Sequence, residues 1–348
     1  MSLTAGVVGG AGTTGGELLR LLARHPALRL ASVGSTSQAG RPLWHAHPHL
    51  RGVLDHRFVP PDEVGDVDVL FSCVPHGESA PQMRSWLGRA RIVVDLSADF
   101  RLADPAAYEA QYGQPHAAPE LLDEAAYGLP ELFRDRIRSA RLIAGPGCTA
   151  AAGMLALVPL VAAGVVEPGR IALDAKVGSS AAGTDPGRSG AHAVRSHVVR
   201  PYAPAGHRHV AEIEQAVRAI AGVETRLAYS AHAVDMVRGI LQTLHAWTTP
   251  GSGVDAALAA YKKFYANEPF VRILAPPGTP RGLPDPRHVA GTNLADLGLA
   301  TDTHAGALAA FAAIDNLGKG AAGSALQCAN IRLGLPETAG LDAVAAYP

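Results

Sequence analysis

The sequence predicts an α/β protein of two domains: a doubly wound parallel sheet first, and then an α+β domain with a mixed or antiparallel sheet. Its length of 348 residues is enough for two domains with cores of their own. Up to about residue 147, short apolar runs alternate with more polar helical segments. Beyond that point, neighbouring strand-like runs are joined by short connections, as in sheets with antiparallel pairs.

The first 35 residues predict a strand, a glycine loop, a helix and a second strand, which is the βαβ opening of a dinucleotide-binding Rossmann domain. Residues 17–22 are apolar at helical spacing, and the segments 78–89 and 104–125 are more polar. The predicted strands of this half cover residues 3–8, 28–33, 67–73, 92–96 and 141–144. We therefore expect the first domain to span residues 1–147.

The second half changes in texture, with strong helix formers over 150–163 and a Gly/Ser/Ala-rich stretch over 178–190 that we expect to be a mobile loop. The other predicted elements are strands at 171–177, 225–234, 238–248 and 306–314 and helices at 208–221, 253–265 and 315–333. We expect a second domain over 148–314, followed by a tail, 315–348.

Composition and charge exclude several classes of protein. With 48% hydrophobic and 18% charged residues the chain is not disordered, and its net charge of −1 gives no field for nucleic acid or a membrane surface. Its three cysteines are far apart, so neither a disulfide framework nor a thiolate zinc site is expected. Without a signal-peptide pattern or a long apolar run, a cytoplasmic location is expected.

Residues 10–15 form a GxGxxG pattern between a predicted strand and a predicted helix. Glycines there allow a tight turn and a close approach of the backbone to a pyrophosphate at the helix N-terminus. A tight turn without a ligand is the alternative. The expected cofactor contacts are Gly9, Gly10, Gly12, Thr13, Thr14 and Gly15.

The second strand ends in Ser35, Thr36 and Ser37, with Arg41 shortly after. A carboxylate at this place would bind the ribose 2′-hydroxyl of NAD, and none is present. Hydroxyl groups without a carboxylate favour a 2′-phosphate. The pattern therefore predicts NADPH/NADP+ as the cofactor.

Cys148 follows a Pro-Gly turn at the start of a predicted helix. A helix N-terminus stabilises a thiolate, which is the nucleophilic form of cysteine. The alternative is a structural cysteine, which is what we expect of Cys73 and Cys328.

His207 stands at another predicted helix start, where Glu212 could orient it, and an imidazole is the usual proton donor and acceptor for a thiolate nucleophile. Surface histidines that cap a helix are the alternative. A second cluster, His45, His47 and His49, has no carboxylate or thiolate at ligand spacing. We expect a loop packed near the cofactor domain there, and no metal.

Two further polar segments stand at element ends. Arg101 follows a strand at its carboxyl end, where a guanidinium could hold a carboxylate or phosphate, or only pair with Asp99. Asn316 belongs to a glycine-rich helix start, where its side chain could hydrogen-bond the nicotinamide amide. Packing of a small-residue helix is the plainer interpretation of that segment.

Together these motifs resemble the N-acetyl-γ-glutamyl-phosphate reductase family, a relative of the aspartate-semialdehyde dehydrogenases, over essentially the whole chain. The matching segments are 9–17, 94–101, 146–148, 207–212, 237–239 and 313–323. The resemblance implies a glyceraldehyde-phosphate-dehydrogenase-like second domain and a two-stage reduction of an acyl phosphate through a cysteine thioester. It implies Cys148 as nucleophile, His207 as general acid/base and Arg101 as substrate anchor. The remaining expected contacts are His209, Glu212 and Arg238 for substrate, with His209 a reserve base, and Ser179, Ala181 and Asn316 for the cofactor.

Several segments resemble the lysine-biosynthesis branch of this family more than the arginine branch. Thr149-Ala150-Ala151 stands where the arginine branch usually has Tyr-Pro-Thr, and residues 265–272, 284–287 and 291–296 resemble the lysine branch. The implied substrate is LysW-γ-L-α-aminoadipyl 6-phosphate, attached to LysW, a small acidic amino-group carrier protein. N-acetyl-γ-glutamyl phosphate is the alternative substrate.

The resemblance also implies that residues 148–314 are the catalytic and oligomerisation domain of a homo-oligomer, either a dimer or a tetramer, and that the tail, 315–348, completes the first domain. The Arg-rich stretch 188–200 could meet an acidic carrier, or could be a solvated loop. Two alternatives of other classes are a non-catalytic NADP-sensing Rossmann protein and a thiol acyl-hydrolase.

Overall fold

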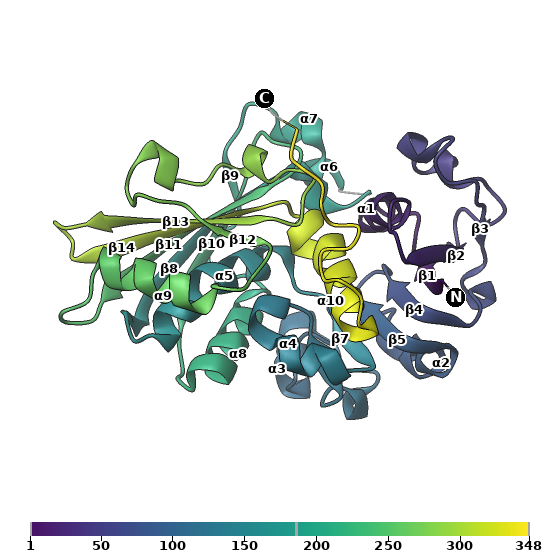
Figure 1. Cartoon of the computed structure of the whole chain (residues 1–348), viewed down its shortest axis with the longest axis horizontal. Coiled ribbons are helices and arrows are strands. Elements are labelled where there is room, and N and C mark those ends of the chain that lie inside the picture. The colour runs from purple at the N-terminus through teal and green to yellow at the C-terminus, as the bar shows by residue number, and fades with distance from the viewer. Residues whose placement is uncertain (1, 185–186, 347–348) are drawn as a thin grey trace. The chain divides into compact units, whose positions relative to one another are not determined.

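The structure is a computed structural model that describes residues 2–184 and 187–346. It divides into two compact units. Unit 1 comprises residues 1–146 and 321–342, and unit 2 comprises residues 147–320 and 343–348. The chain therefore passes from one unit to the other after Pro146, after Gly320 and after Asp342. The two ends of the chain and the course between them can be followed by colour in Figure 1.

Unit 1 contains a parallel sheet of seven strands in the order β3-β2-β1-β4-β5-β7-β6. The strands are β1 (Leu3–Val8), β2 (Leu28–Gly34), β3 (Phe58–Val59), β4 (Val67–Ser72), β5 (Ala90–Asp95), β6 (Ala125–Tyr127) and β7 (Leu142–Ala144). The strand order reverses between β1 and β4, and parallel sheets bind ligands at the carboxyl ends of such neighbours. The loop after β1, residues 9–12, lies at this edge.

The helices of unit 1 are α1 (Thr13–Leu22), α2 (Met83–Arg89), α3 (Pro105–Tyr112), α4 (Pro130–Ser139) and α10 (Gly323–Leu333). The last of these comes from the far end of the chain and packs against α4 and β5 (Figure 1, yellow). Its eight buried residues include Gln327 and Asn330, which bond Glu131 and His25 of the same unit. The helix predicted over 315–333 therefore begins later, after a π-helical turn at Gly318–Ala322.

Unit 2 contains a mixed sheet in the order β12-β13-β14-β11-β8-β10-β9, in which β8–β10 and β12–β13 are parallel pairs. Its strands are β8 (Val166–Val177), β9 (Arg200–Ala203), β10 (Leu227–Ala233), β11 (Ile240–Thr248), β12 (Val271–Ile273), β13 (Ala295–Asp302) and β14 (Ala307–Ile314). Its helices are α5 (Cys148–Ala162), α6 (Gly187–Gly190), α7 (His192–Arg195), α8 (Val210–Ala221) and α9 (Val254–Phe264). Both parts of the fold prediction, a parallel sheet and then a mixed one, are confirmed.

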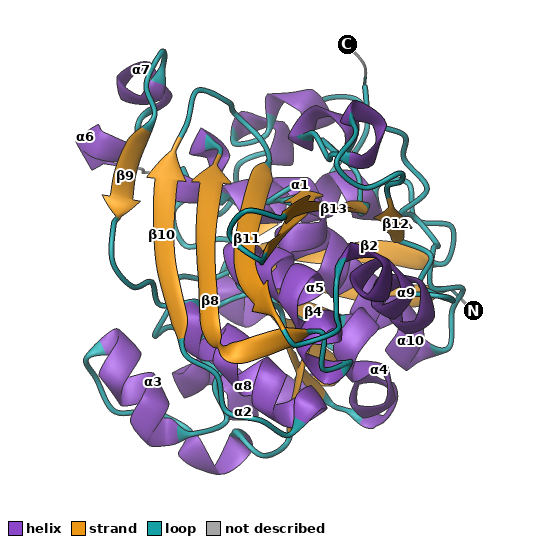
Figure 2. Cartoon of the chain, turned by 90° about the vertical axis from the view of Figure 1, so that its left-hand side faces the viewer, coloured by secondary structure: helices purple, strands orange, loops and turns teal. Residues whose placement is uncertain are grey.

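Helix α5 is the central element of unit 2. Its residues 149–161 are all buried, because α8, α9 and the strands β8, β11 and β14 surround it. A helix that is apolar on every side needs such cover. Figure 2 shows β10, β8 and β11 with α5 on one side of them, and no helix from the described residues of unit 2 lies over the other face of these strands.

Three local predictions need correction. Strand β8 begins at Val166 rather than 171, because Pro168 and Gly169 hide its first half in the sequence. Strand β13 pairs with β14 along its whole length and with β12 at Ala295–Leu297, although its sequence has no strand-like apolar run. The predicted loop 178–190 contains a 3₁₀ turn at Ser179–Ala182 and the one-turn helix α6, with residues 185–186 outside the described ones.

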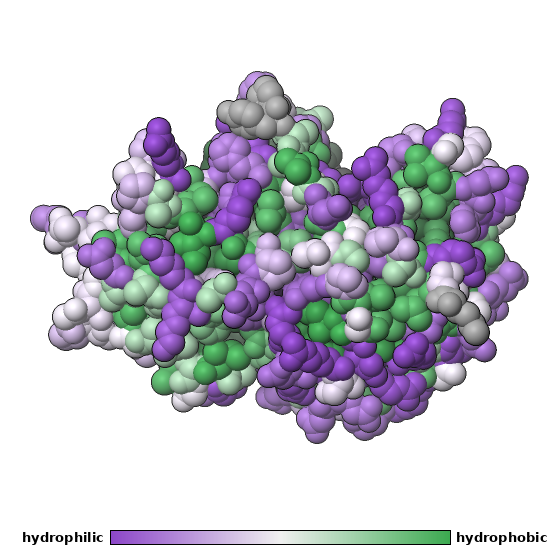
Figure 3. All heavy atoms as spheres, viewed as in Figure 1, coloured by the Kyte–Doolittle hydropathy of each residue, from purple (hydrophilic) through white to green (hydrophobic). Residues whose placement is uncertain are grey.

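The hydropathy of the surface and of the helices bears on membrane association. On the face drawn in Figure 3, hydrophilic and hydrophobic residues are intermixed. Within residues 2–184 and 187–346, no helix combines the length and the apolar character that crossing a bilayer requires.

Candidate active site

The glycine loop of unit 1 joins β1 to α1. Gly9 has a φ of +73°, and a Cβ there would lie 2.7 Å from the backbone of Cys73, so the turn requires glycine. The first turn of α1 contains no acidic side chain, and its N-cap is Gly12. Thr13 and Thr14 are the first two residues of the helix, which leaves the positive helix end available to an anion.

The three glycines of the GxGxxG pattern have different surroundings. A Cβ on Gly10 would lie 2.3 Å from Val33 Cγ1, and one on Gly15 would lie 2.6 Å from the Gly10 carbonyl oxygen. A Cβ on Gly12 would have its nearest neighbour at 3.7 Å, the Gly9 oxygen. Gly10 and Gly15 therefore serve close packing, whereas Gly12 leaves room for a ligand to approach the backbone.

The end of β2 carries the residues predicted to select the cofactor. Ser35 is buried, and its Oγ accepts a hydrogen bond from the Gln38 N–H at 3.3 Å. Thr36 and Ser37 are exposed. The Arg41 guanidinium donates a hydrogen bond to Gln38 Oε1 at 3.4 Å. The segment thus presents hydroxyl groups and a guanidinium to solvent, while the Ser35 hydroxyl shapes the turn.

Cys148 is the first residue of α5, behind the N-cap Gly147. No acidic side chain lies in the first turn, so the helix end stabilises a thiolate there. Gly320 packs directly against it, since a Cβ on Gly320 would lie 2.8 Å from Cys148 Cβ. The other cysteines differ: burial raises the pKa of Cys73 to about 12, and Cys328 is fully buried inside α10.

A buried polar network supports the start of α5. The Gly147 N–H donates to Glu212 Oε2 at 3.0 Å, and Thr149 Oγ1 lies 2.6 Å from His209 Nδ1. His209 Nε2 is 3.9 Å from Glu212 Oε1. His209 and Glu212 are 4% and 1% exposed, so both ring nitrogens of His209 face protein groups.

His207 lies beside this network and is neutral at physiological pH. Burial, and then the charge of Arg208, lowers the pKa of His207 to about 4. The His209 backbone N–H donates to His207 Nδ1 at 3.1 Å, so the neutral ring carries its proton on Nε2. Its ring contacts those of Tyr202 and Tyr229, at centroid distances of 6.1 and 5.5 Å.

His207 is joined to the start of α5 through His209, whose ring centroid lies 4.5 Å from that of His207 and whose Nδ1 bonds Thr149. The two tyrosines beside His207 also feel the charge of Cys148. Desolvation, and then the charge of Cys148, raises the pKa of Tyr202 to about 12. Burial also raises the pKa of Tyr229, whose hydroxyl bonds Thr149 and lies 3.4 Å from Gln242 Oε1. Cys148 and His207 therefore belong to one cluster of side chains in unit 2.

Glu212, which the sequence offered as a group that could orient His207, has other partners in the structure. From α8, the Glu212 carboxylate is directed to Gly147 and His209, because position 212 lies one helical turn after 209. Sequence reasoning also missed Thr149, Tyr202 and Tyr229. Thr149 had a usable signal, its place next to Cys148, whereas the tyrosines come from β9 and β10 and had none.

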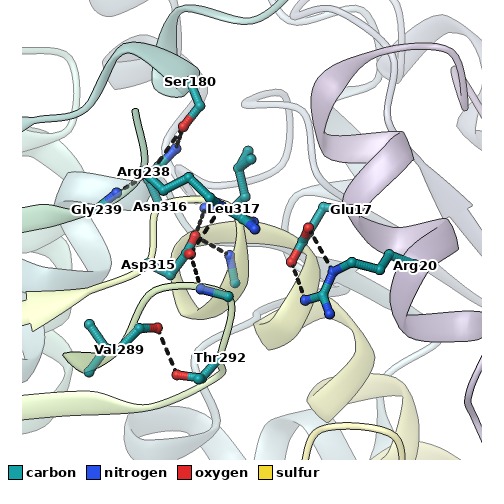
Figure 4. A network of polar contacts seen from close by, with 12 residues as sticks. Glu17, Arg20, Ser180, Arg238, Gly239, Val289, Thr292, Asp315, Asn316 and Leu317 are labelled. Atoms are coloured by element: carbon teal, nitrogen blue, oxygen red, sulfur yellow. Dashed lines mark hydrogen bonds and ion pairs between the residues drawn. The ribbon is translucent and has the colours of Figure 1, made fainter. Parts of the chain in front are cut away.

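A second network in unit 2 is centred on fully buried Asp315 (Figure 4). Its carboxylate accepts the N–H groups of Leu317 and Gly318 at 2.8 and 3.0 Å and pairs with Arg238 Nε at 3.1 Å. Next to it, Asn316 Oδ1 accepts the Gly239 N–H at 2.8 Å and Asn316 Nδ2 donates to Ser180 Oγ at 2.9 Å. The Asn316 amide thus already bonds at both ends.

The remaining predicted residues lie as follows. Arg101, 7% exposed, donates to the carbonyls of Gly145 and Leu96 at 2.8 and 3.0 Å within unit 1. Ser179 Oγ is 2.9 Å from His192 Nδ1, and Ala181 is exposed. In the Arg-rich stretch, Arg195 is buried and donates to the Val177 carbonyl at 3.4 Å, so it does not belong to a solvated rim.

The histidine cluster at 45–49 lies in unit 1. His47 is buried against the glycine loop, with Nε2 2.7 Å from the Gly10 oxygen. In the part of the chain that the structure describes, no group of three or more His, Cys, Asp or Glu side chains is arranged to hold a metal ion.

Family models match both halves of the chain. Residues 4–140 match the NAD binding domain of semialdehyde dehydrogenases, and residues 148–316 match the semialdehyde dehydrogenase dimerisation domain. Residues 4–140 are therefore a nicotinamide-nucleotide-binding domain, in agreement with the glycine loop.

Curated relatives cover the whole chain. A putative [LysW]-L-2-aminoadipate 6-phosphate reductase of Thermomicrobium roseum is 45% identical over 100% of both chains. A putative [LysW]-L-2-aminoadipate/[LysW]-L-glutamate phosphate reductase of Ignicoccus hospitalis is 44% identical over 98% of both. One of Haloarcula marismortui with the same name is 45% identical over 100% of this chain and 99% of its own.

Solved structures agree on the fold. Aspartate semialdehyde dehydrogenase II of Vibrio cholerae aligns with a TM-score of 0.73 at 15% identity, over 96% of this chain and 99% of its own. The Candida albicans enzyme, solved with NADP, aligns with a TM-score of 0.67 at 15% identity, over 95% and 98%. The predictions of an oxidoreductase acting on phosphorylated acyl groups and of the lysine-type branch are confirmed. The chain belongs to the semialdehyde dehydrogenase family, in the branch of the [LysW]-aminoadipate/[LysW]-glutamate phosphate reductases.

Proposed function

We propose that this chain reduces LysW-γ-L-α-aminoadipyl 6-phosphate to the 6-semialdehyde with NADPH, through a thioester on Cys148. The observation that carries the proposal is the surroundings of Cys148. It starts a helix without acidic residues in its first turn, beside the Thr149–His209–Glu212 network and in one cluster with a neutral His207. These are the groups that an acyl-transfer nucleophile needs.

Cys148 acts first as nucleophile. Its thiolate, stabilised by the α5 N-terminus, attacks the acyl carbon; the sulfur–carbon bond forms, the carbon–oxygen bond to phosphate breaks, and phosphate leaves. When bound, NADPH would supply the hydride that reduces the thioester to the aldehyde and frees the Cys148 thiolate.

His207 handles the charges that develop around Cys148. Because Nδ1 accepts the His209 N–H, His207 offers Nε2–H as a donor to the thiolate and then to the oxyanion at the reacting carbon. His209 is less suited to that role, since its Nδ1 bonds Thr149 and its Nε2 faces Glu212. We assign His209 and Glu212 to holding the start of α5, and we keep His207 as the catalytic histidine.

Arg238 and Arg101 are the proposed substrate anchors. The Arg238 side chain is 26% exposed and is oriented by Asp315, so its guanidinium can bind a carboxylate or a phosphate. The Arg101 guanidinium is held by two carbonyl oxygens, which fix its direction.

The residues of unit 1 fit NADPH. The missing Cβ of Gly12 leaves the cradle that a pyrophosphate needs, and Thr13 and Thr14 begin a helix without an acidic first turn. At the end of β2, Thr36, Ser37 and Arg41 would face a 2′-phosphate. We keep Ser179, Ala181 and Asn316 as proposed cofactor contacts. To bond the cofactor, the Asn316 amide would have to give up its hydrogen bond with either Gly239 or Ser180.

We further propose that the substrate arrives on LysW and that the chain is a homo-oligomer. The relatives' names include LysW, and the second family model is described as a dimerisation domain. The face of β8, β10 and β11 that no helix of unit 2 covers carries Asp174, Lys176 and His232, paired with one another. Such a half-polar sheet face suits contact with a second copy. Light scattering of Lys176→Glu should show smaller particles than the wild type.

The deciding experiment runs the reaction backwards. Phosphate-dependent NADP+ reduction is compared on LysW-linked aminoadipate semialdehyde, LysW-linked glutamate semialdehyde and N-acetylglutamate semialdehyde. The proposal expects the highest kcat/KM with the LysW-linked aminoadipate compound. Preference for the acetylated compound would assign the chain to arginine-type chemistry instead. Equal preference for both LysW-linked compounds would extend the substrate to glutamate.

A further inference from the structure

The segment that carries His45, His47 and His49 has no role in the reaction described so far. It forms two short 3₁₀ turns, Leu43–His45 and Pro48–Leu50, and His47 stands between them. The backbone of His47 is fixed, because its N–H donates to the Leu43 carbonyl at 3.0 Å and its carbonyl accepts the Leu50 N–H at 2.9 Å. Leu43 and Leu50 are almost fully buried, so they anchor the segment in unit 1.

The His47 ring lies against the glycine loop. It is 6% exposed, and Nε2 is 2.7 Å from the Gly10 carbonyl oxygen. A carbonyl only accepts, so Nε2 carries the proton and donates. The Gly10 N–H donates in turn to the Gly34 carbonyl at 3.0 Å. The N–H and the carbonyl of Gly10 are thereby both hydrogen-bonded. The next two residues, Ala11 and Gly12, lead into the start of α1.

The same ring explains a second glycine. A Cβ on Gly16 would lie 2.6 Å from both Cε1 and Nδ1 of His47. Gly16 belongs to α1, where glycine is a poor helix former and alanine a good one. The imidazole therefore requires glycine at position 16. Because the ring contacts the loop at Gly10 and the helix at Gly16, it fixes the position of the loop relative to the start of α1.

We propose that His47 is a positioning residue that holds the glycine loop and the first turn of α1 in the shape that binds the dinucleotide. This inference rests on the proposed function, because it concerns the loop assigned to NADPH. Without His47, the buried Gly10 carbonyl loses its partner and the loop must order when the cofactor binds, which weakens affinity. Burial lowers the pKa of His47, so the ring stays neutral and its Nε2–H donor persists.

The first test uses four variants and two measurements. NADPH dissociation constants come from cofactor fluorescence, and kcat comes from assays at saturating NADPH. His47→Leu should raise the NADPH Kd by about tenfold, the usual effect of one lost buried hydrogen bond, and leave kcat within about twofold. His47→Gln, which retains an N–H donor, should recover most of the affinity. The matched controls His45→Ala and His49→Ala remove exposed neighbours and should bind like the wild type.

A double-mutant cycle with Gly16 guards against a variant that simply folds poorly. Gly16→Ala alone should weaken NADPH binding, because its Cβ displaces the ring; in a His47→Ala background the same change should have no further effect. A wild-type Kd in His47→Leu, or additive effects in the cycle, would overturn the inference. Failure of the wild type itself to bind NADPH would instead overturn the proposed function, so the two failures are distinguishable.

Discussion

Helices α1 and α5 begin alike, each behind an N-cap glycine in extended backbone and each without an acidic side chain in its first turn. They differ in what surrounds that glycine. A Cβ on Gly12 would meet only the Gly9 oxygen, at an ordinary 3.7 Å, whereas one on Gly147 would lie 2.6 Å from His209 Nε2 and 2.7 Å from Glu212 Oε1.

This difference separates two uses of the same electrostatics. A positive helix end that is open to the outside suits the phosphates of a ligand. A helix end whose N-cap is packed against buried polar side chains has no room for a ligand there, and instead fixes the side chain of its first residue. In α5 that residue is Cys148, so the field stabilises a thiolate of the protein itself.

The largest expected effect tests the chemical half of this comparison. Cys148→Ser replaces the thiolate with a hydroxyl that the helix end cannot ionise, and NADPH oxidation by the acyl phosphate should fall roughly 10³-fold or more. NADPH binding, measured by fluorescence, should stay as in the wild type. Activity within tenfold of the wild type would remove Cys148 from the mechanism.

The next effect concerns the pH dependence of stability. The pKa of His207 is about 4 when folded and near 6.5 when unfolded, so between these pH values the unfolded chain binds more protons. The contribution of the neutral ring to the free energy of unfolding is fully present above pH 6.5. It decreases by up to about 3 kcal/mol as the pH falls to 4. Urea unfolding of His207→Asn should lose this part of the slope; an unchanged slope would contradict the assignment.

Gly147→Ala tests the packed helix start. The backbone there, φ −64° and ψ 136°, accepts alanine, so any effect comes from the added Cβ against His209 and Glu212. We expect a 10- to 100-fold loss of kcat, equivalent to about 1–3 kcal/mol of lost transition-state stabilisation from overpacking, with an unchanged NADPH Kd. Normal kcat would mean that the network does not position Cys148.

Gly12→Ala is the matched change at the open helix start. Its backbone, φ −76° and ψ 170°, also accepts alanine, and its Cβ would meet nothing closer than 3.7 Å. Stability should therefore change by less than about 0.5 kcal/mol, while the added methyl group weakens NADPH binding roughly tenfold by blocking the pyrophosphate. If instead stability falls and NADPH affinity is unchanged, the N-terminus of α1 is not the pyrophosphate site.

The contrast between the two helix starts also shows what the sequence could predict. Local patterns predicted that a parallel sheet precedes a mixed one, and they located the glycine loop around Gly12 and the helix start at Cys148, because period, glycine spacing and helix start are properties of neighbouring residues. The partner of Glu212 and the place of Tyr229 depend on how α8 and β10 pack on α5, which is not a local property. For the same reason the sequence could not predict that His47, among the three histidines of its segment, is the one that contacts Gly10.

The smallest expected effect concerns the choice between the two nicotinamide cofactors at the open site. The exposed guanidinium of Arg41 is tied only loosely to Gln38, at 3.4 Å, so its attraction to a 2′-phosphate is screened by solvent. Arg41→Ala should weaken NADPH binding about three- to fivefold and leave NADH binding unchanged. Arg51→Ala, which removes an exposed arginine stacked on Trp44 in the same unit, is the control and should change neither constant. Equal losses for both cofactors would place the effect of Arg41 on the loop rather than on the phosphate, and the proposed preference for NADPH would then have to come from Thr36 and Ser37.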